Sequence, residues 1–119
     1  LIREAFPGDW TETPRGTRIR EKLYLEHGDR FDWPDLGAAD GGNEVFCYGL
    51  KDHFGILSDG TVVPCCLDAD GAMPLGNLFE EELDSILSSP RALAIFEGFS
   101  RRRAVEPLCR KCGYAKRFQ

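Results

Sequence analysis

The spacing of the cysteines constrains this chain more than any other feature of its sequence. Twelve residues separate Cys47 from Gly60, four more lead to Cys65, and a C-x-x-C pair, Cys109 and Cys112, lies near the end. A C-x-x-C alone is a weak signal, but here two further cysteines complete a set of four. Structural zinc and iron-sulfur clusters both take four such ligands. The spacing therefore predicts a metal or iron-sulfur site.

A fifth cysteine, Cys66, makes the number odd, which fits poorly with a fully paired disulfide framework. In a chain without secretion signals, grouped cysteines indicate metal ligands or reactive thiols, and we expect a reducing, cytoplasmic compartment. A redox-active pair would require a C-x-x-C near a βαβ unit, and the sequence shows no such unit. We expect Cys66 to be a packed thiol that points away from its neighbour Cys65, with substitution as a ligand as the alternative.

Composition is that of an ordinary globular protein of one domain, with 42% hydrophobic and 29% charged residues. A net charge of -5 argues against nucleic-acid binding. The stretch from Arg101 to the C-terminus is nevertheless basic, with Glu106 as its single acidic residue. We interpret it as a solvated helix end, or as charge that offsets an anionic cluster. No apolar run approaches the ~20 residues that a membrane span needs, and no signal peptide is visible.

The centre of the chain predicts a β-hairpin. Phe54, Ile56 and Thr61–Val63 favour strands, and Ser58–Gly60 between them signals a turn. A hairpin folds its two ends back together, so the cysteine after the second strand returns close to the cysteine before the first.

Two helices are predicted after the hairpin. The first spans Phe79–Ser88, with Glu80–Glu82 in its first turn, where the helix dipole favours acidic residues. The second begins at Pro90, with Ser89 as its N-cap. We expect a small α+β fold in which the hairpin and two to three helices surround a cysteine-ligated site.

Residues 1–44 look like a lead-in to this unit. Ile19 and Leu23 lie four positions apart, which predicts a short helix over 18–27, and the glycines of 37–43 indicate a flexible linker. Two readings of Phe31–Pro34 remain open: ordinary packing, or docking onto a neighbouring domain.

From Cys47 onward the chain resembles a known family. The pattern of a cysteine, nine to fifteen residues, G-x4-C and a later C-x-x-C is similar to the auxiliary-cluster domain of radical S-adenosylmethionine enzymes, called SPASM, or twitch in its shortened form. The segments Ile56–Cys65 and Leu75–Phe79 also resemble stretches of that family. The resemblance covers residues 45–119, and it implies that 1–44 is the tail of a preceding barrel or a linker.

The resemblance implies a cofactor and its ligands. The full domain carries further cysteines after the C-x-x-C and holds two clusters, whereas none follows Cys112 here. One [4Fe-4S] cluster is therefore implied, held by Cys47, Cys65, Cys109 and Cys112. Its expected role is electron transfer or substrate positioning during modification of a peptide, a protein or a small molecule. Ligation by four cysteines favours electron transfer, because no iron is left open.

The implied partner is an N-terminal radical S-adenosylmethionine barrel in the same parent chain. The C-x3-C-x2-C motif that such a barrel uses to cleave S-adenosylmethionine is absent, so this piece carries no catalytic residues of its own, and the oxidoreductase or maturase activity would belong to the parent. The alternative from another class is a zinc-stabilised interaction module, with zinc also able to replace a lost cluster. His53 and His27 are expected to be ordinary histidines, and Asp68 and Asp70 solvated loop residues.

Overall fold

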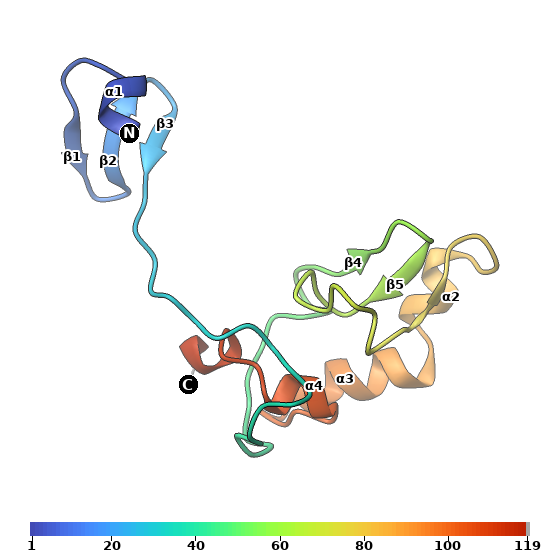
Figure 1. Ribbon diagram of the computed structural model, residues 1–119. Helices are drawn as coiled ribbons and strands as arrows, with labels where there is room; N and C mark the ends of the chain where they lie inside the picture. The colour runs from blue at the N-terminus through green and yellow to red at the C-terminus, as the bar shows by residue number, and fades with distance from the viewer. Residues whose placement is uncertain (119) are drawn as a thin grey trace. The chain divides into compact units, whose positions relative to one another are not determined.

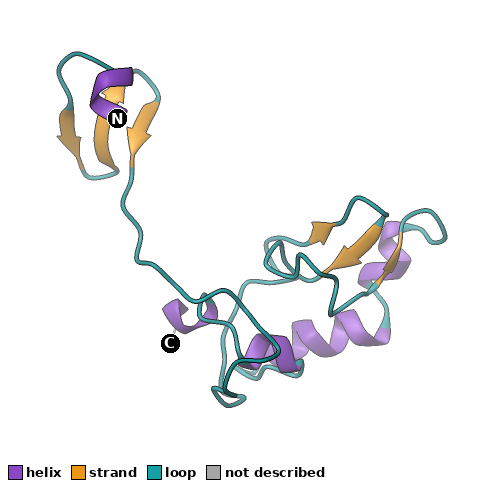
Figure 2. Cartoon of the chain, viewed as in Figure 1, coloured by secondary structure: helices purple, strands orange, loops and turns teal. Residues whose placement is uncertain are grey.

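The computed structural model describes residues 1–118 and divides them into two compact units, the first Leu1–Arg30 and the second beginning at Phe31. Figures 1 and 2 show the elements of each unit, which are described separately below. Among the described residues, no helix has the length and apolar character needed to cross a membrane.

The first unit is a small antiparallel sheet with one short helix. Its elements are α1 (Ile2–Ala5), β1 (Thr11–Thr13), β2 (Gly16–Arg20) and β3 (Leu23–Leu25), with strand order β1-β2-β3. None of residues 1–30 is fully buried, so this sheet encloses no core of its own.

The prediction of a helix over 18–27 is therefore wrong. Burial along β2 alternates at Arg18, Ile19 and Arg20, which is the period of a strand, not of a helix. Lys22 has a φ of 61°, which marks a tight turn into β3. Leu23 pairs with Arg20 across that turn, so its four-residue spacing from Ile19 reflects a hairpin.

The second unit contains the predicted central hairpin. Its strands are β4 (Gly55–Ile56), β5 (Thr61–Val63) and β6 (Gly76–Asn77), in the order β4-β5-β6, all antiparallel. Gly60 has a φ of 86° in the connecting turn, a conformation that glycine adopts without strain. The side chain of Asp59 closes the turn by accepting the Thr61 amide at 3.0 Å. The prediction of a hairpin with a glycine turn is confirmed.

Helices follow this sheet in the chain. They are α2 (Leu83–Leu87), α3 (Pro90–Ser100) and α4 (Pro107–Arg110), followed by the 3-10 helix η1 (Ala115–Phe118). Of these, α2 and α3 share the buried core of the sheet. The Ser89 side chain accepts the Ala92 amide at 3.4 Å, which confirms the predicted cap of α3. The helix α2 begins later than predicted because Asn77 captures the amides of residues 79–81 in a turn of its own. Glu80–Glu82 therefore precede the helix, and their predicted place in its first turn is wrong.

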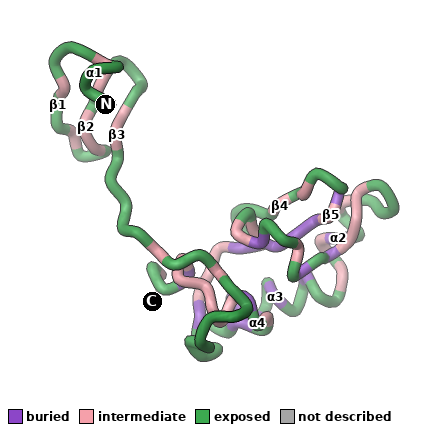
Figure 3. The backbone as a smooth tube through the Cα atoms, viewed as in Figure 1, coloured by how far each residue is buried: buried purple, intermediate pink, exposed green. Residues whose placement is uncertain are grey.

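Figure 3 shows where the core lies: the buried segments are in β5, along one side of α3 and in the chain leading into and out of the helices. The buried cluster consists of Val45, Val62, Leu75, Ile86, Ala92, Ile95, Phe99, Ala104 and Ala115. Cys47, Cys109 and Cys112 pack against this cluster from its edge. The mixed α+β fold expected from the sequence is confirmed, and its core supports the cysteine-bearing segments.

Residues 31–44 belong to the second unit. The Phe31 ring contacts Tyr114 edge-on, with 5.0 Å between ring centroids, and the Gly113 amide donates to the Asp32 carbonyl at 3.1 Å. Further along, the Gly41 amide donates to the Arg110 carbonyl at 3.0 Å. This segment therefore contacts the C-x-x-C region, and the flexible linker expected over 37–43 stays a prediction.

Candidate metal centre

One cavity of the second unit brings all the cysteines together. It has a volume of about 300 Å³ and is lined by Cys47, Cys65, Cys66, Cys109 and Cys112, with His53 and Tyr114 also on its wall. The two cysteines around the hairpin are thus brought together with the distant C-x-x-C pair.

Three separate segments supply these residues. Cys47 follows Val45, whose amide donates to the Arg102 carbonyl at 3.0 Å, and this bond fixes the approach to the hairpin. Cys65 follows β5 directly after the buried Pro64. The other pair lies on α4 and in the turn after it, where the Cys112 amide donates to the Cys109 carbonyl at 3.4 Å. The segments meet because the hairpin and α4 pack on one core.

Backbone amides favour negative charge on two of the sulfurs. The Gly49 amide donates to Cys47 Sγ at 3.4 Å. The amides of Leu67 and Asp68 lower the pKa of the Cys65 thiol in part. Hydrogen bonds of this kind stabilise negative charge on sulfur, the charge that a ligating thiolate carries.

Burial opposes that charge when no metal is present. It raises the pKa of Cys65 to about 11, although the two amides lower it in part. Burial also raises the pKa of Cys47 and that of Cys109, and nearby cysteines add to both shifts. The Cys109 thiol is turned toward Met73, whose Sδ lies 3.6 Å away. These thiols are therefore protonated at neutral pH in the metal-free chain, and a bound cation would have to displace their protons.

The cysteines line one cavity. Among residues 1–118, no group of three His, Cys, Asp or Glu side chains is arranged to hold a single metal ion. A tetrahedral zinc site, with zinc–sulfur bonds of about 2.3 Å, needs its sulfurs about 3.8 Å apart. In an iron-sulfur cluster each thiolate can bind a different iron, so the sulfurs stand further apart around a larger body. Cysteines from three segments around one cavity of about 300 Å³ provide the kind of donor set that such a cluster needs.

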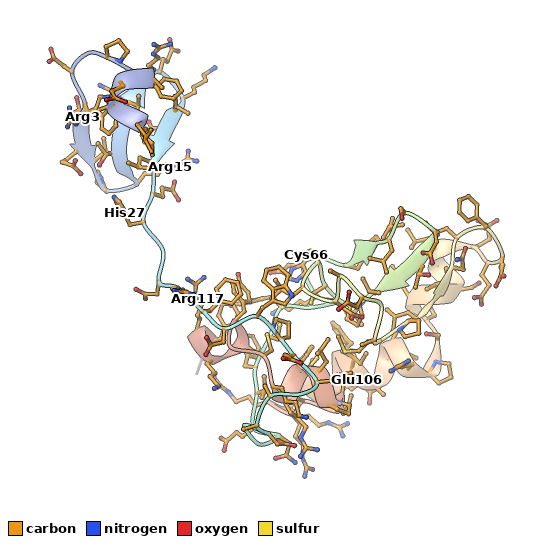
Figure 4. All side chains as sticks on the ribbon, in the orientation of Figure 1. Arg3, Arg15, His27, Cys66, Glu106 and Arg117 are labelled. Atoms are coloured by element: carbon orange, nitrogen blue, oxygen red, sulfur yellow. The ribbon has the colours of Figure 1, made fainter. Side chains whose placement is uncertain are left out.

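Cys66 is exposed, so the expectation of a packed thiol is wrong. It lies on the loop after β5, labelled in Figure 4, and contributes to the cavity wall. Its place beside Cys65 leaves its use as a substitute ligand a prediction. His53 is exposed and lines the same cavity, whereas His27 belongs to the first unit.

The basic residues near the site have other contacts. Arg110 forms an ion pair with Asp40, its Nε lying 3.2 Å from Oδ1, and Lys111 donates to the Leu36 carbonyl. Arg117 lies over the Phe31 ring, 5.1 Å from its centroid. These contacts fasten residues 31–40 to the C-x-x-C region. A further effect on cluster charge stays a prediction.

Asp68 was missed by the sequence analysis as a structural residue. It is only 1% exposed, so its expected place in a solvated loop is wrong, whereas Asp70 is exposed as expected. The one clue in the sequence is Gly71, which has a φ of 67° and marks a tight turn three residues later.

The fold and the cavity define a small α+β domain that gathers cysteines from three segments. Residues 47–113, more than half of the chain, match the SPASM family, an iron-sulfur cluster-binding domain, and the chain belongs to that family. Neither a search of curated proteins nor one of solved structures gave a significant match. The family resemblance expected from the cysteine spacing is confirmed, and with it iron-sulfur cluster binding.

Proposed function

We propose that Cys47, Cys65, Cys109 and Cys112 ligate one [4Fe-4S] cluster. The observation that carries this proposal is the single cavity of about 300 Å³ into which three segments deliver these cysteines. All four lie within the stretch that matches the iron-sulfur family.

We further propose that the domain serves a radical S-adenosylmethionine barrel of the same protein by electron transfer. When bound, such a cluster takes up or gives up one electron at a time. With four cysteine ligands no iron is left for a substrate atom, so a redox role fits better than substrate coordination. The parent would modify a peptide, a protein or a small molecule. A reducing cytoplasm suits the free thiols of the metal-free chain.

The residues around the cavity have roles in this function that follow from their positions. The amide of Gly49 and those of Leu67 and Asp68 stabilise thiolate charge at two ligands. Phe99 and Tyr114 line the same cavity and limit access of water to it. Exclusion of water and amide hydrogen bonds to sulfur are two of the factors that set a cluster's reduction potential.

The test is anaerobic reconstitution of the chain with iron and sulfide, followed by a visible spectrum and an iron and zinc count. We expect a brown protein with about four irons per chain. In Cys109→Ala the iron content should fall, because one ligand is lost. Cys66→Ala is the matched control and should load like wild type. A colourless protein that binds one zinc and does not bind iron would favour the alternative of a zinc-stabilised interaction module.

The partner can be checked from the coding sequence upstream of Leu1. We expect it to encode a barrel with a C-x3-C-x2-C motif. An upstream reading frame without such a motif would contradict the proposed partnership and leave cluster binding untouched.

A further inference from the structure

The loop after Cys65 is closed around one buried carboxylate. Asp68 accepts the amide of Ala72 at 2.7 Å through Oδ1 and that of Met73 at 2.8 Å through Oδ2. Its own amide donates to the Cys65 carbonyl at 3.2 Å. A carboxylate that is 1% exposed and accepts through both oxygens fixes the loop from its first residue to its last.

The far end of this loop reaches the other cysteine-bearing segment. Met73 is 2% exposed, and its Sδ lies 3.6 Å from Cys109 Sγ. A buried Met73 therefore connects the carboxylate-closed loop with α4. Through these two contacts, Asp68 links Cys65, which follows β5, with Cys109, which lies 44 positions further along the chain.

A second connection runs through α3. Arg91 makes a two-pronged ion pair with Glu106, with Nε 2.7 Å from Oε1 and Nη2 2.9 Å from Oε2. Its third nitrogen donates to the Pro74 carbonyl at 3.2 Å. Glu106 is the residue before α4, as Figure 4 shows, and its side chain is only 13% exposed. One guanidinium thus joins the end of the loop to the start of the helix that carries Cys109.

We infer that Asp68 and Arg91 are positioning residues that hold the Cys65 loop and α4 at the separation a cluster requires. The inference rests on the proposed cluster ligation by these cysteines. Neither residue touches the cavity that the cysteines line. They act through the backbone of the loop, through Met73 and through Glu106.

The contacts of Asp68 also affect the reduction potential of a bound cluster. The amide of Asp68 donates to the Cys65 carbonyl at 3.2 Å, which holds the start of the loop beside that cysteine. The amides of Leu67 and Asp68 also favour the charged form of the Cys65 thiol. If the loop loosens, the amide dipoles move away from the sulfur, and the more negative, reduced form of the cluster loses stabilisation. Loss of the carboxylate should therefore lower the reduction potential as well as weaken retention.

The experiment compares Asp68→Asn with Asp70→Asn in the full chain. Asn keeps the shape of Asp but replaces one acceptor oxygen with a donor, so one loop amide loses its partner. Asp70 lies on the same loop and is exposed, so its variant matches the charge change. After anaerobic reconstitution, we expect Asp68→Asn to release iron to a chelator about tenfold faster than wild type. Its reduction potential should be more negative, while Asp70→Asn should match wild type in both.

A readout without the cluster separates this inference from the proposed function. In the metal-free chain, the amides of Ala72 and Met73 should exchange with deuterium faster in Asp68→Asn than in Asp70→Asn. If wild type takes up no cluster, the proposed function fails. If the amides exchange at equal rates in the two variants, the positioning role of Asp68 is overturned as well. Equal release rates and potentials in loaded protein would overturn the inference alone.

If Asp68→Asn does not fold, the Arg91→Lys variant tests the inference instead. Lysine keeps the charge but cannot bridge both Glu106 oxygens and the Pro74 carbonyl at once. Its control is Arg101→Lys, which alters an exposed pair with Glu97 at 3.9 Å. We expect faster iron release only from Arg91→Lys, and release as slow as in the control would overturn the inference.

Discussion

At the scale of single residues, the five thiols differ in how well solvent reaches them. Cys66 is exposed, whereas the other four are half-buried around the cavity. Since the thiolate is the reactive form, both access and pKa decide how fast a thiol is alkylated. Burial that raises the pKa of Cys65 to about 11 leaves about one thiol in a thousand ionised at pH 8.

This difference predicts an order of labelling in the metal-free chain. With iodoacetamide at pH 8, we expect Cys66 to react first and Cys109 among the last, because burial also raises the pKa of Cys109. Peptide mass spectrometry over a time course measures the order. In cluster-loaded protein, Cys66 should remain reactive while the four proposed ligands are protected. Labelling of Cys109 as fast as Cys66 would contradict the burial described here.

At the scale of elements, a glycine sets how closely the C-x-x-C turn approaches residues 31–34. A Cβ on Gly113 would lie 2.5 Å from the Asp32 carbonyl oxygen and 2.7 Å from its nitrogen. Both are backbone atoms, so they cannot rotate away as the end of a side chain would. Only glycine fits at this contact, and the contact holds Phe31 against Tyr114.

Gly113→Ala should therefore push this segment off the turn. We expect a loss of roughly 1–3 kcal/mol in unfolding free energy, the usual cost of overpacking a close contact. Denaturant unfolding measures the free energy, and Trp33 fluorescence in a Trp10→Phe background reports the displacement. Gly37→Ala is the control, since its added Cβ would meet only the Asp35 side chain, at 3.3 Å. An unchanged stability and spectrum would show that the contact can adjust.

Elements whose signals are local were predictable from the sequence. The turn at Asp59–Gly60 and the cap of α3 at Ser89 each depend on residues within three positions of one another, and both were predicted. The helix α2 was placed too early because Asn77 diverts its first amides. The prediction of a helix over 18–27 was wrong because a pair of strands accounts equally well for two apolar residues four positions apart.

Spacing and family pattern pointed to the cysteines that the structure places around one cavity, and their ligand role stays a prediction, whereas the residues proposed to support them were not predicted. Asp68 and Arg91 act through partners that are 5 and 15 positions away, and nothing in the local sequence identifies those partners. Burial of a carboxylate in an Ala- and Asp-rich loop is likewise decided by tertiary packing, not by composition. Sequence reasoning therefore identifies candidate ligands more readily than the residues proposed to position them.

At the scale of the whole molecule, the candidate site lies entirely within the second unit. Residues 31–44 belong to that unit and contact the C-x-x-C region through Phe31, Asp32 and Asp40. The first unit has no fully buried residue. The residues that line the cavity all come from the stretch 47–115. The smallest chain that preserves the site should therefore begin near Phe31, not at residue 45.

Two truncations test this boundary. A chain that begins at Phe31 should bind as much iron on reconstitution as the full chain and release it to a chelator at the same rate. A chain that begins at Val45 loses the ring that packs on Tyr114 and the carboxylate that pairs with Arg110, so both ends of the C-x-x-C segment are left unsupported. We expect it to bind less iron and to release it at least severalfold faster. Equal retention by both truncations would mean that the core from Val45 onward positions the four cysteines without help from 31–44. Loss of iron from the Phe31 chain would instead show that the first unit contributes to the site.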